Sequence, residues 1–460
     1  MSGTAGKILV ESILRLLRRN ADKHLARMLR RVHAADIAAA FVQLSPTDAI
    51  RLFRIIPDIE LQGQTLSEAD PESQRNILGA LHDDELLEII KSLSADDAAD
   101  IIALLPDERS AALLENWKGD DANEVDTLLA YDEDTAGGIM SPHVFALSGP
   151  TTCREAIETL QASHEDIEMA FYLYVVNEHG QLIGICNLRQ LVVSDPGRSL
   201  ESIMISEVVS VRTGTDQGEV ARLVAKYNFL ALPVVDESNK LVGLVTVDDV
   251  IDVIQAKHTE DLLSMAGAGG IDLDEQLTPF DSARRRMPWL AASFIAGIGS
   301  MFVINSFESV LSQIAVLAAF IPITLGMGGN VGTQAATIVT RGLALGRVQT
   351  SQFMRVLGRE VLVGLIAGAT YGLLLGLFAA AVFRGGNASE GWSAWQLAGT
   401  VSISVACSMT IAATLGGAVP LFFAKIGIDP AVATNPIVTT TTDLVGVSIY
   451  FVVGRAFFHL

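Results

Sequence analysis

The sequence predicts a multi-domain membrane protein. Its expected parts are an all-α helical-repeat N-terminal domain, an α/β tandem repeat pair, a connecting helix and a five-span α-helical transmembrane domain. Three observations predict this fold class: short amphipathic patterns at the start, an ungapped internal repeat in the middle, and long apolar stretches at the end. The predicted boundaries are 1–140 for the first domain, 141–203 and 204–258 for the two repeats, 259–287 for the connecting helix and 288–460 for the transmembrane domain.

The sequence of residues 1–140 predicts a series of short helices. These helices are expected to pair as hairpins that stack into a small superhelix. Apolar residues recur at spacings of three and four, for example at Leu86, Ile89 and Ile90. Ser45 followed by Pro46 is a typical start of a helix. No pair of side chains in this region has the spacing of a catalytic site.

Residues 141–258 contain the internal repeat. VVNEHGQLIGI, which begins at Val175, aligns without gaps with VVDESNKLVGL, which begins at Val234. Each copy predicts a helix, a strand, a tight turn, a second strand and a closing helix. Thr215 and Thr246 are predicted to cap helices in the second copy.

The repeat pair resembles tandem CBS domains, most specifically in LPVVDESNKLVGLVTVDDVIDVI (residues 232–254). This resemblance implies a regulatory module that binds an adenosine nucleotide such as ATP, or metal ions. A role in dimerisation alone is the alternative.

The connecting helix, residues 259–287, is predicted to be amphipathic. Leu277, Phe280 and Met287 share one face at helical spacing. Two interpretations stay open: an anchor that lies on the inner membrane surface, or a lever that carries movement of the repeats to the membrane.

Five apolar stretches reach the ~20 residues that a helix needs to cross a bilayer. They lie at about 288–307, 309–340, 361–383, 396–424 and 431–459. The second contains Pro322 and several glycines, and we expect a broken helix there. Arg284, Arg285 and Arg286 precede the first span, and the other basic clusters fall on the same side, which the positive-inside rule assigns to the cytoplasm.

These charges predict a multi-pass protein of the cell (inner) membrane with cytoplasmic N-terminal domains and an external C-terminus. Glu11 and Arg15 interrupt the first apolar run, so no signal peptide is expected. Cys153, Cys186 and Cys407 are too scattered for a disulfide framework or a zinc site and are expected to be packing residues.

Charge separates the two halves of the chain. From residue 288 onward there are 7 basic residues (Lys and Arg) and 5 acidic residues (Asp and Glu). The preceding residues contain 25 basic and 48 acidic residues. This excess of acid excludes general affinity for nucleic acid, which requires clustered basic residues. It suits a surface that meets cations, although ordinary solubilising charge would look the same.

Asp443 lies inside the apolar run IVTTTTDLVGVSIYFVV, residues 437–453. An ionised side chain at the centre of a spanning helix costs about 2.5–3.5 kcal/mol on insertion scales. It therefore usually faces a water-filled path and binds a cation. A buried structural hydrogen bond to a neighbouring Thr or Ser is the alternative.

The order of these parts and three motifs resemble the MgtE family of magnesium channels. The motifs are PITLGMGGNVGTQ (322–334), the set DPA (429–431), NP (435–436) and TDLVG (442–446), and the less specific DTAGGIM (134–140). The resemblance implies a homodimer with ten membrane helices in a lipid bilayer, Mg²⁺ permeation, and closure by cytoplasmic Mg²⁺.

Candidate pore residues follow from both the motifs and the chemistry of the ion. Mg²⁺ sheds water reluctantly and binds through few carboxylates and several retained waters. Two copies of Asp443 on a dimer axis would balance its charge. Asn330 and Asn435 are expected to offer amide oxygens. The glycines and the proline beside them are expected to leave backbone carbonyl oxygens without a helical hydrogen bond.

The resemblance also implies regulatory Mg²⁺ sites at Asp249, Asp252, Glu260 and Asp261. Gly218, Asn228 and Lys257 stand where the family pattern is acidic, which implies fewer regulatory ions or weaker inhibition.

Three other functions remain open: transport of another divalent cation such as Co²⁺, regulated transport of an anion or osmolyte, and a membrane-tethered sensor. An enzyme is not expected, because no Ser-His-Asp set, phosphate loop or metal-hydrolase spacing is found in the sequence.

Overall fold

The computed structural model describes residues 3–117, 119–162, 171–269, 278–384 and 392–458; the side chains of residues 3–7, 120 and 432–435 lie outside this description. The chain divides into two compact units, of which the first extends to Lys257 and the second begins at His258.

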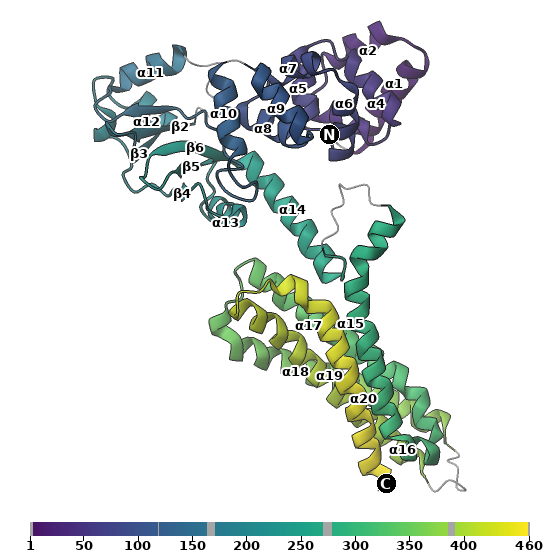
Figure 1. Ribbon diagram of the computed structural model, residues 1–460. Helices are drawn as coiled ribbons and strands as arrows, with labels where there is room; N and C mark the ends of the chain where they lie inside the picture. The colour runs from purple at the N-terminus through teal and green to yellow at the C-terminus, as the bar shows by residue number, and fades with distance from the viewer. Residues whose placement is uncertain (1–2, 118, 163–170, 270–277, 385–391, 459–460) are drawn as a thin grey trace. The chain divides into compact units, whose positions relative to one another are not determined.

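The first unit begins with an array of short helices (Figure 1). Their bounds are α1 Gly3–Arg18, α2 Asp22–Leu29, α3 Ala34–Phe41, α4 Pro46–Ile55, α5 Ile59–Ser67, α6 Pro71–Ala80, α7 Asp83–Ile90, α8 Ala95–Ala103, α9 Asp107–Asn116 and α10 Asp120–Leu129. Ser45 caps α4 as predicted, because its hydroxyl accepts a hydrogen bond from the Asp48 backbone N–H at 3.2 Å.

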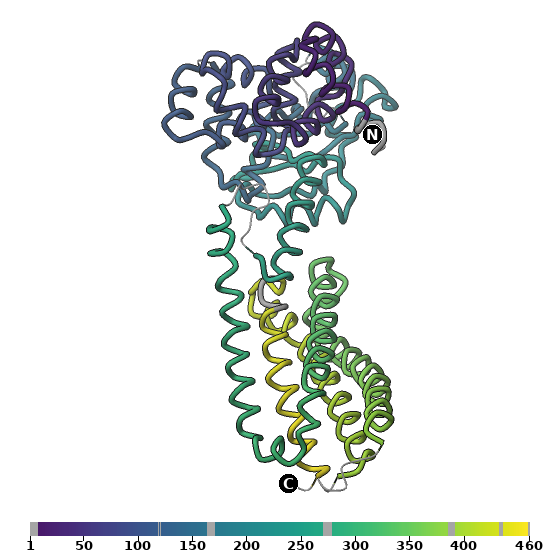
Figure 2. Tube along the Cα trace, turned by 90° about the vertical axis from the view of Figure 1, so that its right-hand side faces the viewer, coloured from purple at the N-terminus to yellow at the C-terminus, as the bar shows by residue number. Residues whose placement is uncertain are grey.

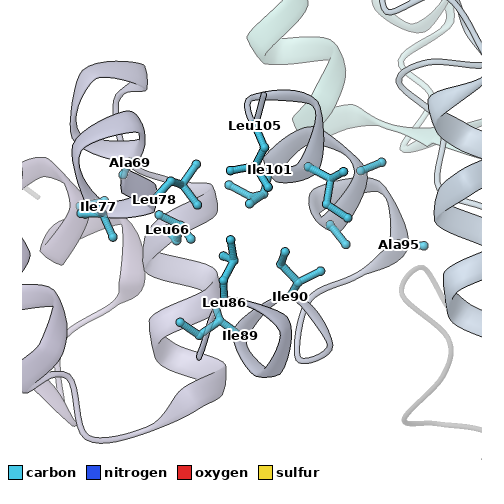
Figure 3. Packing of buried hydrophobic residues seen from close by; sticks show 14 of the residues in the cluster. Leu66, Ala69, Ile77, Leu78, Leu86, Ile89, Ile90, Ala95, Ile101 and Leu105 are labelled. Carbon is cyan, nitrogen blue, oxygen red and sulfur yellow. The ribbon is translucent and has the colours of Figure 1, made fainter. Parts of the chain in front are cut away.

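Apolar residues of successive helices form the core of this array (Figure 3). Leu66 of α5, Ile77 of α6, Leu86 and Ile90 of α7, and Ile102 of α8 are completely buried. The three-and-four spacing in the sequence places these side chains on the inner face of each helix, which confirms the predicted all-α domain.

Two three-stranded sheets follow, one for each repeat. The elements are β1 Ala146–Ser148, α11 Cys153–Ala162, β2 Tyr172–Val176, β3 Leu182–Asn187 and α12 Leu188–Val193, then η1 Leu200–Ser202, and then β4 Val211–Arg212, α13 Gln217–Tyr227, β5 Ala231–Val235, β6 Leu241–Thr246 and α14 Val247–Met265. In each sheet the first two strands are parallel and the last two antiparallel. The ungapped sequence repeat is therefore a structural repeat.

The two sheets meet at their tight turns. Gln181 forms a bridge with Lys240, Leu182 N–H donates to the Asn239 carbonyl at 3.1 Å, and Leu241 N–H donates to the Gly180 carbonyl at 3.1 Å. The backbone joins the two copies in an almost symmetric way.

Of the two predicted caps, the one at Thr215 is wrong. Thr246 precedes α14 and its hydroxyl donates to the Asp249 carboxylate in the first turn. The N-cap of α13 is Asp216, whose carboxylate accepts from the Glu219 N–H, whereas Thr215 accepts from the Arg212 N–H in the preceding turn. Asp competes well with Thr as a cap, and sequence alone did not separate the two neighbours.

The second unit is a helical bundle (Figures 1 and 2). Its elements are α15 Pro279–Ser306, α16 Glu308–Gln313, η2 Ala315–Phe320, α17 Ile321–Ala344, η3 Thr350–Gln352, α18 Phe353–Val382, α19 Ala394–Lys425 and α20 Pro430–Phe458. Within the described residues, five helical segments are long and apolar enough to cross a membrane, which confirms the predicted number. α19 is central and packs against α17, α18 and α20, while α15 packs against α20.

The structure corrects two expectations about these helices. The second apolar stretch, 309–340, is interrupted as expected, but at a different place: α16 and η2 precede α17, whereas the expected break was at the glycines. α17 is continuous from Ile321, and Pro322 occupies its first turn, where its missing N–H is harmless. Residues 259–287 do not form one connecting helix, because α14 ends at Met265 and α15 begins at Pro279. Of the predicted amphipathic face, Leu277 lies outside the described residues, and Phe280 and Met287 belong to α15.

A ladder of glycines joins α18 to α19. Gly364, Gly368, Gly372 and Gly376 are all buried, and a methyl group on Gly368 would lie 2.7 Å from the Ala406 carbonyl oxygen. Helices in a membrane gain most of their association from such close packing, because lipid offers little hydrophobic drive. Of the three cysteines, Cys153 and Cys186 are buried as expected, whereas Cys407 on α19 is exposed.

The glycine ladder predicts opposite effects of alanine at two positions of α18. Gly368→Ala should lower the thermal stability of the detergent-solubilised protein, at a cost of about 1–3 kcal/mol for overpacking. Gly358→Ala, where nothing lies within 4 Å of the new methyl group, should be neutral or stabilise by about 0.5–1 kcal/mol. Equal melting temperatures for the two variants would show that α18 is not held by this contact.

Candidate metal centre

A hollow of about 660 Å³ lies between α17 and α20 in the second unit. It is lined by Leu325, Gly326, Gly329, Asn330, Thr333, Gln334, Thr439 and Asp443. Asp443 supplies the single charged group in this lining, and the other polar groups are neutral amides and hydroxyls. The site is therefore acidic and rich in oxygen.

Close packing of three helices places the Asp443 carboxylate at this hollow. A methyl group at Gly329 would lie 3.8 Å from Asp443 Oδ1, so the carboxylate faces the α17 backbone. Gly332 packs against side chains of α20, and Ser408 of α19 lies against Gly446 of α20. Glycine at these positions lets the three backbones approach without filling the hollow.

The structure places two of the three expected pore residues at the hollow and does not describe the side chain of the third. Asn330 and Asp443 line the same hollow, as the motifs suggested. Asn435 lies in the helical backbone of α20, but its side chain is outside the described residues. The expected free carbonyls at the α17 glycines are not formed, because the helix is regular there.

Sequence reasoning missed Thr333, Gln334 and Thr439 as lining residues. The signal was present: Gly326, Gly329, Asn330, Thr333 and Gln334 recur at spacings of three and four, which places them on one face of a helix. The prediction of a break in α17 hid this periodicity.

Glu360 of α18 does not belong to the hollow. Its side chain is buried, with 6% of its surface exposed, and packs against Gly417 of α19. Among the residues that the structure describes, no salt bridge joins it to Arg355 or Arg359.

The four predicted regulatory acids all lie on α14 but do not converge. Asp252 and Glu260 are eight residues apart, or about 12 Å along a helix, so they form two separate pairs. Within the residues that the structure describes, no group of three or more His, Cys, Asp or Glu side chains is arranged to hold a metal ion. Any ion bound here therefore keeps water or takes ligands from elsewhere.

The two pairs have different surroundings. Partial burial, and then the charge of Asp248, raises the pKa of Asp252. Asp261 is buried, with 8% of its surface exposed, while Glu260 is exposed. Near them, Arg341 of α17 lies 3.3 Å from His258 of α14, which ties the end of α14 to the bundle.

A further acidic cluster lies on α8, where sequence reasoning predicted nothing. Burial raises the pKa of Asp96. Loss of solvent, and then the charges of Asp97, Asp96 and Glu133, raises the pKa of Asp100 to about 7, although the outer part of its side chain remains accessible. Such shifts are typical of carboxylates that are held close together.

Three family models match the chain in the order of its domains. The models are described as the MgtE intracellular N domain at residues 32–134, the CBS domain at 136–195 and 200–256, and a divalent cation transporter at 321–453.

Curated relatives match over nearly the full length. The magnesium transporter MgtE of Thermus thermophilus is 35% identical over 97% of this chain and 98% of its own length. The magnesium transporter MgtE of Bacillus subtilis is 30% identical over 94% of this chain and 96% of its own.

Solved structures match the first unit. The cytosolic domain of the Mg²⁺ channel MgtE in complex with ATP has a TM-score of 0.51 and 38% identity, over 53% of this chain and 99% of that one. The soluble part of a magnesium transporter has a TM-score of 0.50 and 26% identity, over 55% of this chain and 99% of that one.

The pKa of Asp100 predicts a stability that depends on pH. An aspartate with a raised pKa keeps its proton in the folded state after the unfolded chain has released it. The resulting stabilisation is complete below about pH 4 and is lost as pH rises to about 7. Asp100→Asn should remove this component, so the variant should be more stable than wild type above pH 7.

Thermal unfolding between pH 4 and pH 9 measures this difference. The exposed Asp107→Asn on α9 is the matched control and should follow wild type. A parallel pair of curves for wild type and Asp100→Asn would contradict the raised pKa.

Proposed function

Since the chain belongs to the MgtE family of transporters, we propose that it carries Mg²⁺ down its electrochemical gradient through a path lined by Asp443. One observation carries the proposal: the hollow between α17 and α20 combines a single carboxylate with neutral amide and hydroxyl oxygens. None of the described residues that line it is Lys or Arg, so the lining favours a cation over an anion or osmolyte.

The size and chemistry of the hollow suit an ion that keeps its water. Mg²⁺ demands octahedral oxygen geometry at about 2.0–2.1 Å and usually retains several waters. Asn330, Thr333 and Gln334 offer oxygens that accept hydrogen bonds from such waters. We infer that Asp443 supplies the charge and that these neutral groups hold the hydration shell.

We propose that the functional unit is a homodimer in which two Asp443 carboxylates share one axial ion. Two charges of −1 balance one ion of +2 without direct removal of its waters. The exposure of α15 supports a partner in the membrane, because none of its side chains is buried within its own chain. Apolar residues such as Phe294 and Met301 are available to a second copy or to lipid.

We propose that Mg²⁺ in the cytoplasm closes the path through the acids on α14. Asp249 and Asp252 begin this helix beside the second CBS copy, and Glu260 and Asp261 are near its end, beside the bundle. A cation that neutralises either pair would lower the repulsion among carboxylates on one helix. Bound ions would thereby favour one arrangement of the helix over another.

We propose that the CBS pair also binds an adenosine nucleotide. Support comes from the 38% identity to a cytosolic domain whose structure was solved with ATP. We further propose a cytoplasmic first unit and an external C-terminus, since Arg284, Arg285 and Arg286 lie in the first turns of α15.

The pore assignment predicts that Asp443→Ala abolishes Mg²⁺ flux into proteoliposomes. Asp443→Asn, which keeps the shape and one oxygen but loses the charge, should also lose most of the flux. Neutral amides cannot balance a divalent ion in a site with no other charge. Flux is measured with an internal Mg²⁺ indicator, at fixed membrane potential.

Glu360→Gln is the matched control, because it removes a buried carboxylate from the same unit but outside the hollow. It should keep the flux. Size-exclusion profiles should be the same for all variants, so that lost flux is not lost folding. Wild-type flux in a well-folded Asp443→Ala protein would refute the pore assignment.

The regulatory proposal predicts that millimolar Mg²⁺ slows tryptic cleavage at Lys257, an exposed residue of α14, more than NaCl of equal ionic strength does. The double variant Asp249→Asn, Asp252→Asn should lose this difference. Equal effects of both salts would point to screening alone. A separate arm with ATP should slow cleavage at Lys240, beside the turn that joins the sheets, if the CBS pair binds nucleotide.

A further inference from the structure

The N-terminal tip of the first unit has a charge opposite to the rest of that unit. Residues 1–33 contain eight basic residues (Lys and Arg) and two acidic residues (Asp and Glu). Residues 34–287 contain 17 basic and 46 acidic residues. In an acidic body, so many basic residues in so short a segment are not explained by average composition.

The fold presents these charges on one surface. Val10, Ile13 and Leu17 of α1 are buried in the helical array, so the opposite side of α1 faces outward. We define the basic tip as the exposed residues Arg15, Arg18, Arg19, Lys23, Arg27, Arg30 and Arg31 of α1, α2 and their flanking turns. Figure 1 shows α1 and α2 next to each other in the array.

Part of the basic tip surrounds a hollow. Glu11, Leu14, Arg15, Arg18 and Arg19 line a space of about 370 Å³. Three guanidinium groups around one depression match phosphate, because the planar fork of arginine forms paired hydrogen bonds to phosphate oxygens. Glu11 is the one acid in this lining and offsets only part of the charge.

The charges of the basic tip are not neutralised by ion pairs within the part of the chain that the structure describes. None of its seven side chains forms a salt bridge there, and nearby Asp22 is paired with Arg51 at 2.7 Å. The negative end of the α1 dipole favours Arg15 and Arg18, but that effect is limited to the last turn. It does not explain the four basic residues of α2 and the turn after it.

We propose that the basic tip docks on the anionic phospholipid headgroups of the membrane that this chain spans. The phosphate-matched hollow carries the chemistry. Ile8 precedes Glu11 by about one turn of α1, and with 59% of its surface exposed it offers an apolar contact of the kind that interfacial helices use. Clusters of four to eight basic residues near a membrane are sufficient for such binding.

Tethering selects this occupant over a free polyanion. At low ionic strength the net charge of −21 opposes the approach of any polyanion, the bilayer included. A bilayer that the same chain crosses is always near, at a high effective concentration that depends on the length of chain between tip and membrane. Screening beyond about 8 Å then leaves the local positive charge of the tip to act alone.

Energy transfer in nanodiscs tests the proposal on the full-length protein. A donor dye is attached to cysteine in His24→Cys, Cys407→Ala, because His24 is exposed within the tip and Cys407 is the exposed native cysteine. The acceptor is a headgroup-labelled lipid. Transfer should be greater in discs that contain phosphatidylglycerol than in pure phosphatidylcholine, and high salt should abolish the difference.

The triple variant Arg15→Gln, Arg18→Gln, Arg19→Gln should reduce docking to anionic discs by at least about tenfold, since each basic residue near an anionic surface contributes about fivefold in affinity. Arg154→Gln, Arg189→Gln, Arg222→Gln removes the same charge from exposed positions outside the tip and should behave as wild type. Melting temperature checks that both variants fold.

Two outcomes would overturn the proposal. The first is energy transfer that does not depend on lipid charge in the wild type, which would leave the tip to a protein partner or to solvent. The second is an equal response of both triple variants, which would make the effect one of overall charge rather than of this surface.

Discussion

The strongest constraint on the second unit is the Asp443 carboxylate, because it lies within a helix that is long and apolar enough to cross a membrane. A charged group in hydrocarbon is tolerated only beside a water-filled space or a partner. Gly329 and Gly446 satisfy this requirement, because they let α17, α19 and α20 pack backbone to backbone while an open space remains beside the carboxylate. The glycines at the contact of α17 with α20 and the neutral lining of the hollow can both be understood as consequences of that one group.

The sequence was informative where local chemistry decides structure. The ungapped repeat placed both sheets in register, because Gly180 and Asn239 accept the positive φ angles that their tight turns require. The buried periodicity of α5 to α8 predicted the helical array. The sequence was less informative where neighbouring helices decide the structure. Pro322 and the glycines of α17 look like helix breakers, yet Pro322 lies in the first turn and Gly328 and Gly332 lie against neighbouring helices.

The candidate site was predictable only in part for the same reason. Asp443 and Asn330 stood out by their chemistry, but Thr439 belongs to the lining only because α20 packs on α17. The cluster around Asp100 depends on Glu133, which is 33 residues away in sequence and brought close only by folding. Long-range pairings of this kind leave no periodic signal in a single sequence.

The seam between the two CBS sheets has a consequence for how this region folds. Tyr174 and Leu182 of the first copy and Ala231, Val235 and Leu244 of the second belong to one apolar cluster. Neither copy can bury its side of that cluster alone, so a separated half would expose it together with unpaired backbone at the turns. The duplicated halves should therefore gain and lose structure together as one cooperative unit, in a single step of hydrogen exchange rather than two.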